Sequence, residues 1–227
     1  MATKPAKKTA AKKTAATPPP AEDESAPAIE ISRIGTETLL IPIVGSAPLI
    51  MHKFSEKAKR QMLDAMQGRK SPKAPKDPEG DYEAAAYKMD DGGYGFPSIA
   101  FKAATVSAAR FFDKSVTMVS LRQTLFFSGT MSKTEGQMMV VIEGEPIMRE
   151  DVVRVGNGGT DLRYRPQFTE WSTTLEVTYV KSMLTRESVL SLIDAGGLGV
   201  GVGEWRPEKK GDMGTFMIDP TRSVEIK

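Results

Sequence analysis

Residues 172–180, STTLEVTYV, narrow the possible folds of this chain more than any other segment. Leu175, Val177 and Tyr179 alternate with polar residues, which is the period-two pattern of a strand with one buried face. The sequence therefore predicts a half-buried strand here, in a sheet that has a second, solvent-facing side.

A helix and another strand are expected to follow. Residues 186–195 carry apolar side chains at helical spacing, with Thr185 placed to cap the first turn and Gly196–Gly197 placed to end the helix. Residues 214–219 then read as a strand. The second half of the chain is thus expected to contain a strand–helix–strand unit.

The same order is expected earlier, with a strand at 36–45, a helix at 98–112 and a strand at 121–127. Two such units predict an α+β fold with a ferredoxin-like split β-α-β sheet that has helices on one face and leaves the other open to a ligand. Pro42 lacks a backbone N–H, so we expect the first strand at an edge or a bulge.

We expect one folded domain over residues 29–227, with β-hairpin and loop insertions near 53–95 and 128–170. The first insertion is expected to hold a helix at 55–67 and a proline-rich loop at 68–81. The second is expected to hold β-strands, which are residues 138–143, 146–155 and 161–168.

Residues 1–28 have a different composition. Residues 1–20 carry five lysines, no acidic residue and almost no large apolar residue, so they cannot bury enough surface to offset the entropy of ordering. We expect a disordered basic arm that holds nucleic acid by neutralising phosphates. A leader that only improves solubility is the alternative.

The composition of the chain excludes several classes of chemistry. There is no cysteine and one histidine, His52, so disulfides, thiolate ligands and histidine-rich metal sites are excluded. No apolar run is long enough for a membrane span or a secretory signal. We expect a cytoplasmic protein with no cofactor and no metal.

Three segments carry a family resemblance. FPSIAFKAATVSAAR (96–110), with Pro97 and Lys102, resembles a helix start of the RAMP superfamily, although Ala103 stands where glycine is usual. GGLGVGVGEWRPEKKGDMGTF (196–216) is similar to the glycine-rich loop of that superfamily. LLIPIVGSAPLIMHK (39–53) is similar to its first strand. From about residue 36 the chain also resembles a group of tailed-phage proteins. The resemblance implies an RNA-recognition-motif-like fold, nucleic-acid binding and the side-by-side assembly of CRISPR backbone subunits.

The glycine-rich stretch is the main candidate for contact with nucleic acid. Closely spaced glycines let backbone N–H groups approach phosphates, while cations neutralise the charge and an indole stacks on a base. The candidate residues are Gly197, Gly199, Gly201, Gly203, Trp205, Arg206, Lys209 and Lys210. In the alternative interpretation the glycines only allow tight packing, with Leu198, Val200 and Val202 in the core.

Other cations are weaker candidates for the same role. Each has an ordinary alternative as a solvated side chain or as one partner of a structural ion pair. They are Lys53, Arg69, Lys70, Lys73, Lys102, Arg163 and Arg165.

Three functions remain open from the sequence. The first is a phage-encoded, non-catalytic protein that coats single-stranded RNA or DNA as a head-to-tail homo-oligomer. The second is a metal-independent endoribonuclease in which His52 acts as general base. The third is a phage structural or assembly protein.

Overall fold

The computed structural model describes residues 31–69, 75–114, 116–155 and 159–227. The chain divides into two units, Met1–Arg33 and Ile34–Lys227, and every helix and strand discussed below belongs to the second. The predicted arm, residues 1–28, lies outside the described residues. Among the residues described, no helix is long and apolar enough to cross a membrane.

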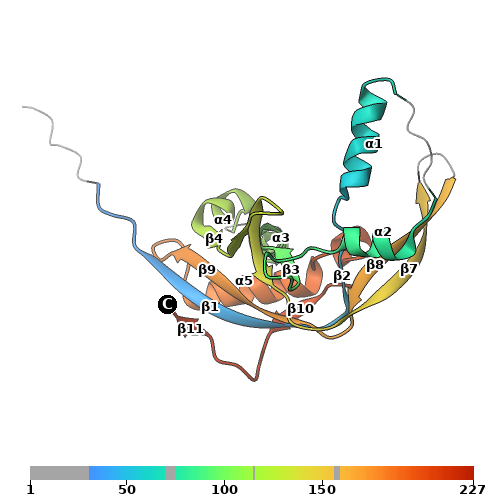
Figure 1. Ribbon diagram of the computed structural model, residues 1–227. Coiled ribbons are helices and arrows are strands. Elements are labelled where there is room, and N and C mark those ends of the chain that lie inside the picture. The colour runs from blue at the N-terminus through green and yellow to red at the C-terminus, as the bar shows by residue number, and fades with distance from the viewer. Residues whose placement is uncertain (1–30, 70–74, 115, 156–158) are drawn as a thin grey trace, which may run out of the picture. The chain divides into compact units, whose positions relative to one another are not determined.

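The main sheet has the split β-α-β arrangement predicted from the sequence. Its strands follow the order β10 (Phe216–Ile218), β1 (Thr36–Gly45), β9 (Ser172–Val180), β4 (Leu125–Phe127), and all neighbours are antiparallel (Figure 1). β9 therefore separates the two strands of the first unit, and β1 separates those of the second. A short strand, β11 (Glu225–Ile226), also pairs with β1. The ferredoxin-like α+β fold is confirmed.

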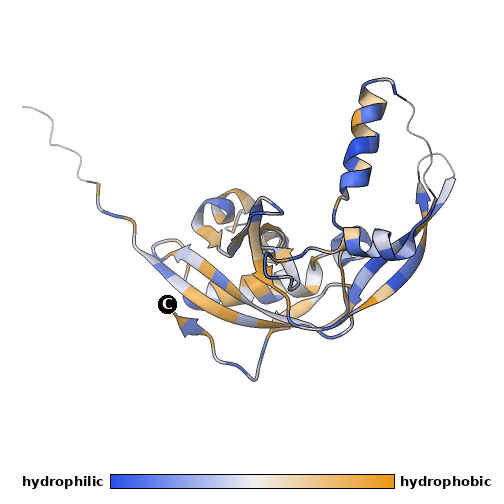
Figure 2. Cartoon of the chain, viewed as in Figure 1, coloured by the Kyte–Doolittle hydropathy of each residue, from blue (hydrophilic) through white to orange (hydrophobic). Residues whose placement is uncertain are grey.

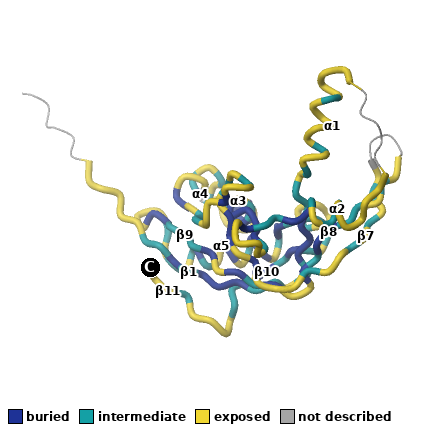
Figure 3. The backbone as a smooth tube through the Cα atoms, viewed as in Figure 1, coloured by how far each residue is buried: buried dark blue, intermediate teal, exposed yellow. Residues whose placement is uncertain are grey.

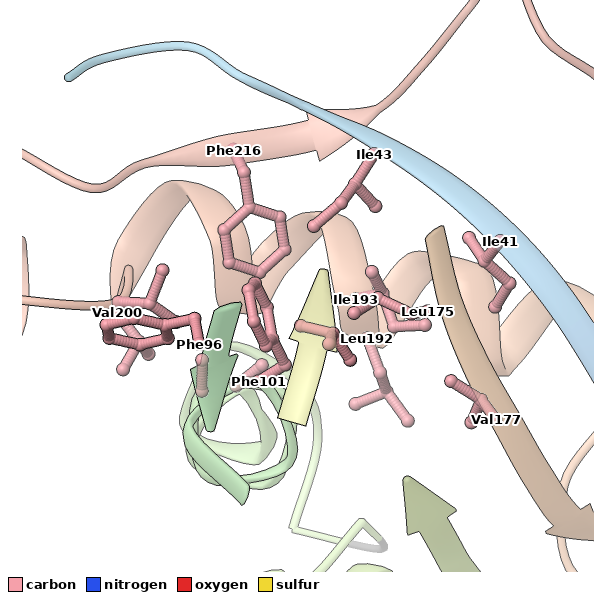
Figure 4. Packing of buried hydrophobic residues seen from close by; sticks show 14 of the residues in the cluster. Ile41, Ile43, Phe96, Phe101, Leu175, Val177, Leu192, Ile193, Val200 and Phe216 are labelled. Atoms are coloured by element: carbon pink, nitrogen blue, oxygen red, sulfur yellow. The ribbon is translucent and has the colours of Figure 1, made fainter. Parts of the chain in front are cut away.

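One face of this sheet forms the core. Leu175 and Val177 of β9 and Ile41 of β1 are buried and point toward the two helices that cover the sheet, α3 (Ser98–Ser107) and α5 (Arg186–Gly199) (Figure 4). Thr174, Glu176 and Thr178 of β9 lie on the opposite face, as the alternation predicts.

The two covering helices differ from the prediction at their ends. α5 begins where expected, because the Thr185 hydroxyl accepts a hydrogen bond from the Ser188 N–H, but it continues through Gly196–Gly197 to Gly199. The predicted stop is wrong, since both glycines fit inside the helix at points of close packing. The helix predicted over 98–112 is α-helical only as far as Ser107, and a 3-10 turn over Ala108–Phe111 follows it.

Residues 121–124 were expected to be strand and are helical. They end α4 (Met118–Thr124), which is capped by the Thr117 hydroxyl accepting from the Ser120 N–H. Leu121 and Thr124 turn one side of this short helix into the protein. Tertiary contact and the cap thus override the strand-like composition, and only Leu125–Phe127 pair with β9.

Pro42 lies inside β1, between two neighbours and in an unbroken register with β9, so the prediction of an edge strand or a bulge is wrong. On one side it is opposite Thr174 of β9. On the other side β10 pairs with residues 43–45 and β11 with residues 39–40, which leaves a gap facing Pro42. In that gap the Asp219 N–H donates to the Pro42 carbonyl at 3.0 Å. The proline nitrogen, which has no hydrogen to donate, therefore faces this gap and not a neighbouring strand.

The two insertions add a long ribbon, a small sheet and two helices. β7 (Pro146–Val155) and β8 (Gly159–Phe168) form the ribbon, and β2 (Leu49–Ile50) pairs with the base of β8. The small sheet has the order β3 (Gly95–Pro97), β6 (Gln137–Val141), β5 (Thr130–Ser132). The predicted strands of the second insertion are therefore present.

The helices of the first insertion are α1 (Glu56–Met66) and α2 (Pro78–Ala85). Ser55 caps α1 as expected, but α2 begins inside the predicted loop 68–81, with Asp77 as its cap. α1 has no buried residue (Figure 3), and its apolar residues lie among hydrophilic ones along the helix (Figure 2). α2 lies against β8, so one side of the ribbon is covered.

Candidate nucleic-acid interface

The glycines of the glycine-rich stretch lie where larger residues do not fit. A Cβ on Gly197 would be 2.1 Å from the Phe216 carbonyl oxygen, and one on Gly199 would be 2.4 Å from the Phe111 ring. Gly201 and Gly203 have positive φ values of 70° and 77°. Tight packing thus accounts for these glycines, and Val200 and Val202 are buried as that interpretation expects, but Leu198 is exposed. Contact between their amides and phosphate stays a prediction.

The end of this stretch forms a turn with a strained tryptophan. Trp205 has φ of 56°, which is rare for a bulky residue, and its side chain is 43% exposed. Its carbonyl accepts a hydrogen bond from the Met213 N–H at 2.9 Å, which holds the backbone in place. The exposed indole is available for stacking, but it lines neither of the two hollows described below.

The cations of this turn divide into two kinds. The Arg206 guanidinium donates to the Gly203 carbonyl and to the Glu208 carboxylate, both at 3.0 Å, so it holds the turn together. Lys209 and Lys210 are exposed, and within the described part of the chain their side chains have no partner. These two lysines are free to meet an anion.

A hollow of about 370 Å³ lies between α3 and the glycine-rich stretch. Ile99, Ala100 and Ala103 line one side, and Gly201 and Gly203 line the other. The motifs at 96–110 and 196–216, far apart in the sequence, thus meet at one site.

Lys102 is not part of that hollow. Its Nζ donates to the Arg122 carbonyl at 3.0 Å, at the end of α4, and lies 5.4 Å from the centre of the Phe126 ring. A cation is favourable at the C-terminus of a helix. The structure therefore places Lys102 in a contact between α3 and α4.

A larger hollow of about 860 Å³ lies between α1, α2 and β8. Its lining includes five cationic side chains and two carboxylates. The cations are Lys53, Lys57, Lys76, Arg163 and Arg165, and the carboxylates are Asp81 and Asp161. His52 lines both hollows, so the two adjoin. The sequence did not single out Lys57 or Lys76, because only the fold brings them opposite the ribbon.

Most of these cations have weak partners. Lys76 Nζ is 2.8 Å from Asp161 Oδ1, and this hydrogen bond lowers the pKa of Asp161. Lys57 Nζ is 3.5 Å from Asp81, and Arg163 Nε is 3.9 Å from Asp161. Such partly exposed pairs contribute little to stability, so a phosphate chain can compete for the same cations.

Two other predicted cations lie differently. Lys53 pairs with the buried Glu135 carboxylate, which holds it at the rim of the larger hollow. Arg69 is exposed and unpaired within the described residues. Lys70 and Lys73 lie outside the described residues.

A polar cluster lies where the two hollows meet. Glu204 Oε1 is 3.4 Å from His52 Nδ1, and Glu204 Oε2 is 3.6 Å from Arg165 Nη1. Arg165 is 1% exposed, and its Nη2 is 2.5 Å from Asp151. The hydrogen bond with His52 is the main cause of the lowered pKa of Glu204.

This cluster gives Arg165 a structural ion pair, as the alternative interpretation expects, and a contact between Arg165 and nucleic acid stays a prediction. Arg163 and Arg165 are two residues apart in β8, so their side chains lie on the same face. Across the ribbon they are opposite Asp151 and Arg149, respectively. The sequence did not single out Asp151 or Glu204, because nothing in their spacing shows that they meet Arg165. Across the described residues, no three His, Asp or Glu side chains lie close enough together to hold a metal ion.

No family model matches the chain, and no curated protein matches it. The solved structures that match include the crystal structure of Cmr6 from Pyrococcus furiosus, at 10% identity and a TM-score of 0.40, over 82% of this chain and 100% of that one. The cryo-EM structure of the Type III-B Cmr-beta bound to cognate target RNA matches at 8% identity and a TM-score of 0.43, over 84% of this chain and 60% of that one.

Both matches are structures of Cmr proteins. With TM-scores of only 0.40 and 0.43, neither match establishes the family of this chain. The resemblance to tailed-phage proteins is not shown and stays a prediction.

Proposed function

We propose that this protein binds single-stranded nucleic acid without cleaving it, with the larger hollow as the main site. The observation that carries the proposal is a group of three cationic side chains, Lys57, Lys76 and Arg163, which line the space between α1, α2 and β8 and have only weak, partly exposed partners. A phosphodiester chain neutralises such a surface and releases counterions as it binds. The hollow is lined by residues 159–165 of β8, so a strand in it would lie beside the ribbon.

The turn after the glycines provides a second contact in this proposal. Lys209 and Lys210 are exposed and unpaired within the described residues, and the Trp205 indole is half-exposed beside them. Unpaired lysines with an aromatic ring are a common platform for single strands, because phosphate and base are both held.

The experiment is equilibrium binding of the full chain to fluorescently labelled single-stranded RNA, single-stranded DNA and duplex DNA of equal length. We expect both single strands to bind more tightly than the duplex at low salt, with an affinity that falls steeply as salt rises. Absence of binding to either single strand at low salt would refute the proposal. It would favour a structural or assembly protein instead.

A second candidate function is a metal-independent endoribonuclease. It is favoured by the Glu204 carboxylate, which lies 3.4 Å from His52 Nδ1 and leaves Nε2 of the ring for proton transfer. Incubation of RNA with the protein in the presence of a chelator tests it. Cleavage that is lost in His52→Ala would establish this activity, whereas equal RNA recovery with both proteins would exclude it.

We further propose that copies of the protein assemble head to tail along a strand. The β5–β6 hairpin exposes the cross-strand pair Met131 and Met138, which are 55% and 42% exposed. Such a contact is open-ended and yields arcs or filaments. Light scattering should show mass growing with oligonucleotide length, and this growth should be reduced in Met131→Gln. A strict monomer with and without a long oligonucleotide would contradict assembly.

A further inference from the structure

We propose that Arg165 and His52 form a binding site for one phosphate group and that the Glu204 carboxylate covers this site until phosphate displaces it. The inference rests on the proposed function and adds to it a named phosphate position and a residue that opposes binding there. Three features of the cluster carry it.

The first feature is the position of Glu204. Its two carboxylate oxygens face two different side chains, the His52 ring at 3.4 Å and the Arg165 guanidinium at 3.6 Å. A phosphate group also presents several oxygens, so it can face both side chains in the same way. Glu204 is 43% exposed, and its side chain can therefore swing into solvent without disturbing the core.

The second feature is the unused hydrogen-bonding capacity of Arg165. Its Nη2 is bonded to Asp151 at 2.5 Å, but its buried Nε has no partner and its Nη1 is too far from Glu204 for a good hydrogen bond. Buried donors are nearly always satisfied in folded proteins, and an orphan indicates a missing partner. Arg165 lines the larger hollow but is only 1% exposed, so a partner reaches it only after Glu204 has moved aside.

The third feature is the charge balance of the cluster. Asp151 is shared, because Arg149 Nε donates to both of its carboxylate oxygens at 2.9 and 3.0 Å. The guanidiniums of Arg149 and Arg165 thus share the negative charge of Asp151. Glu204 supplies the second negative charge of the cluster. When Glu204 swings away, one buried positive charge is left uncompensated, and an anion is needed in its place.

The test uses the full chain, inorganic phosphate as the probe, and a constant ionic strength set with sodium chloride. Calorimetric titration compares the wild type with Glu204→Gln, which keeps the shape of the side chain and removes its charge. We expect Glu204→Gln to bind phosphate about tenfold more tightly. Glu170→Gln is the matched control, because Glu170 is exposed and lines neither hollow, and its affinity should equal that of the wild type.

A double variant locates the site. Adding Arg165→Lys to Glu204→Gln should abolish the gain, and adding His52→Gln serves the same purpose if the lysine variant does not fold. Equal affinity of Glu204→Gln and wild type would overturn the inference. An equal gain in Glu170→Gln would also overturn it, because the effect would then be one of net charge.

Oligonucleotides separate this inference from the proposed function. If Glu204→Gln tightens binding of single strands as well as of phosphate, the site accepts a phosphate of the strand. If it tightens binding of inorganic phosphate alone, the site is upheld for a free phosphate group, and the link to the strand is refuted. If no variant binds any oligonucleotide while phosphate still binds, the proposed function fails and the phosphate site stands.

Discussion

Gly196 of α5 lies against the backbone of Ala104 in α3, so closely that a Cβ on the glycine would be 2.8 Å from the Ala104 carbonyl carbon and oxygen. The two helices therefore cross with almost no side chain between them. This crossing brings the residues that follow Gly199 beside Ala103, and together these residues line the smaller hollow. Helix packing and the position of the glycine-rich stretch thus depend on one contact.

Replacing Gly196 by alanine should destabilise the protein by about 1–3 kcal/mol, because the new methyl group meets backbone that cannot move aside. Denaturant unfolding measures the change. Gly35→Ala is the control, since a Cβ there meets nothing within 4 Å, and it should leave the free energy of unfolding almost unchanged. Equal stability of the two variants would show that the helices separate easily.

Deletion of residues 1–28 should leave the free energy of unfolding nearly unchanged while weakening the binding of single strands. The segment holds five lysines, each of which can make one phosphate contact. The number of phosphate contacts inferred from the salt dependence of binding should therefore fall by at most about five. Binding at several salt concentrations, with unfolding curves on the same samples, tests both parts. A large loss of stability would contradict the prediction of a disordered arm.

Stability should decline at high pH because of Tyr179. Its hydroxyl donates to Glu37 Oε1 at 2.6 Å, and burial together with this carboxylate raises the pKa of Tyr179 to about 12. The ordinary tyrosine pKa is about 10. The stabilisation is therefore complete below about pH 10 and is lost as pH rises toward about 12.

Denaturant unfolding at several pH values tests this assignment. The wild type should lose more stability between about pH 9 and about pH 11 than Tyr179→Phe. Tyr82, whose pKa is also raised to about 12, is present in both proteins and cancels in the comparison. Parallel pH profiles of the two proteins would show that the hydrogen bond to Glu37 is not responsible.

Lys210 has a strained backbone conformation and is also predicted to contact nucleic acid. Its φ of 65° is unfavourable for lysine and free for glycine. Lys210→Gly should therefore raise the free energy of unfolding by about 1 kcal/mol and at the same time weaken the binding of single strands. Lys209→Gln, one residue earlier, should weaken binding without the gain in stability. Unchanged binding in both variants would remove this turn from the interface.

The sheet was predictable because its signals are local. The alternation in residues 172–180, and the order of strand and helix on both sides of it, depend only on neighbours in the sequence. Thr185 likewise caps α5 as expected. Predictions failed where distant contacts decide. The side chains of Leu121 and Thr124 are buried in α4, and the gap facing Pro42 exists only because β10 and β11 leave it.

The candidate site was only partly predictable for the same reason. A glycine-rich stretch can be seen in the sequence, but its role in packing depends on Ala104 and Phe216, which lie elsewhere in the chain. Arg165 was visible as a cation, while its burial against Asp151 was not. Glu204 directly follows the glycines, but no pattern relates it to His52.

The most direct test of the account neutralises two cations of the larger hollow, in the double variant Lys57→Gln/Arg163→Gln, and measures affinity for a single strand over a range of salt. Both side chains line the hollow in weak surface pairs, so the fold should persist. Lys181→Gln is the control, since Lys181 is an exposed lysine that lines neither hollow. We predict weaker binding and a salt slope smaller by about 1.4, from two lost phosphate contacts. An affinity and a slope equal to those of Lys181→Gln would contradict the account.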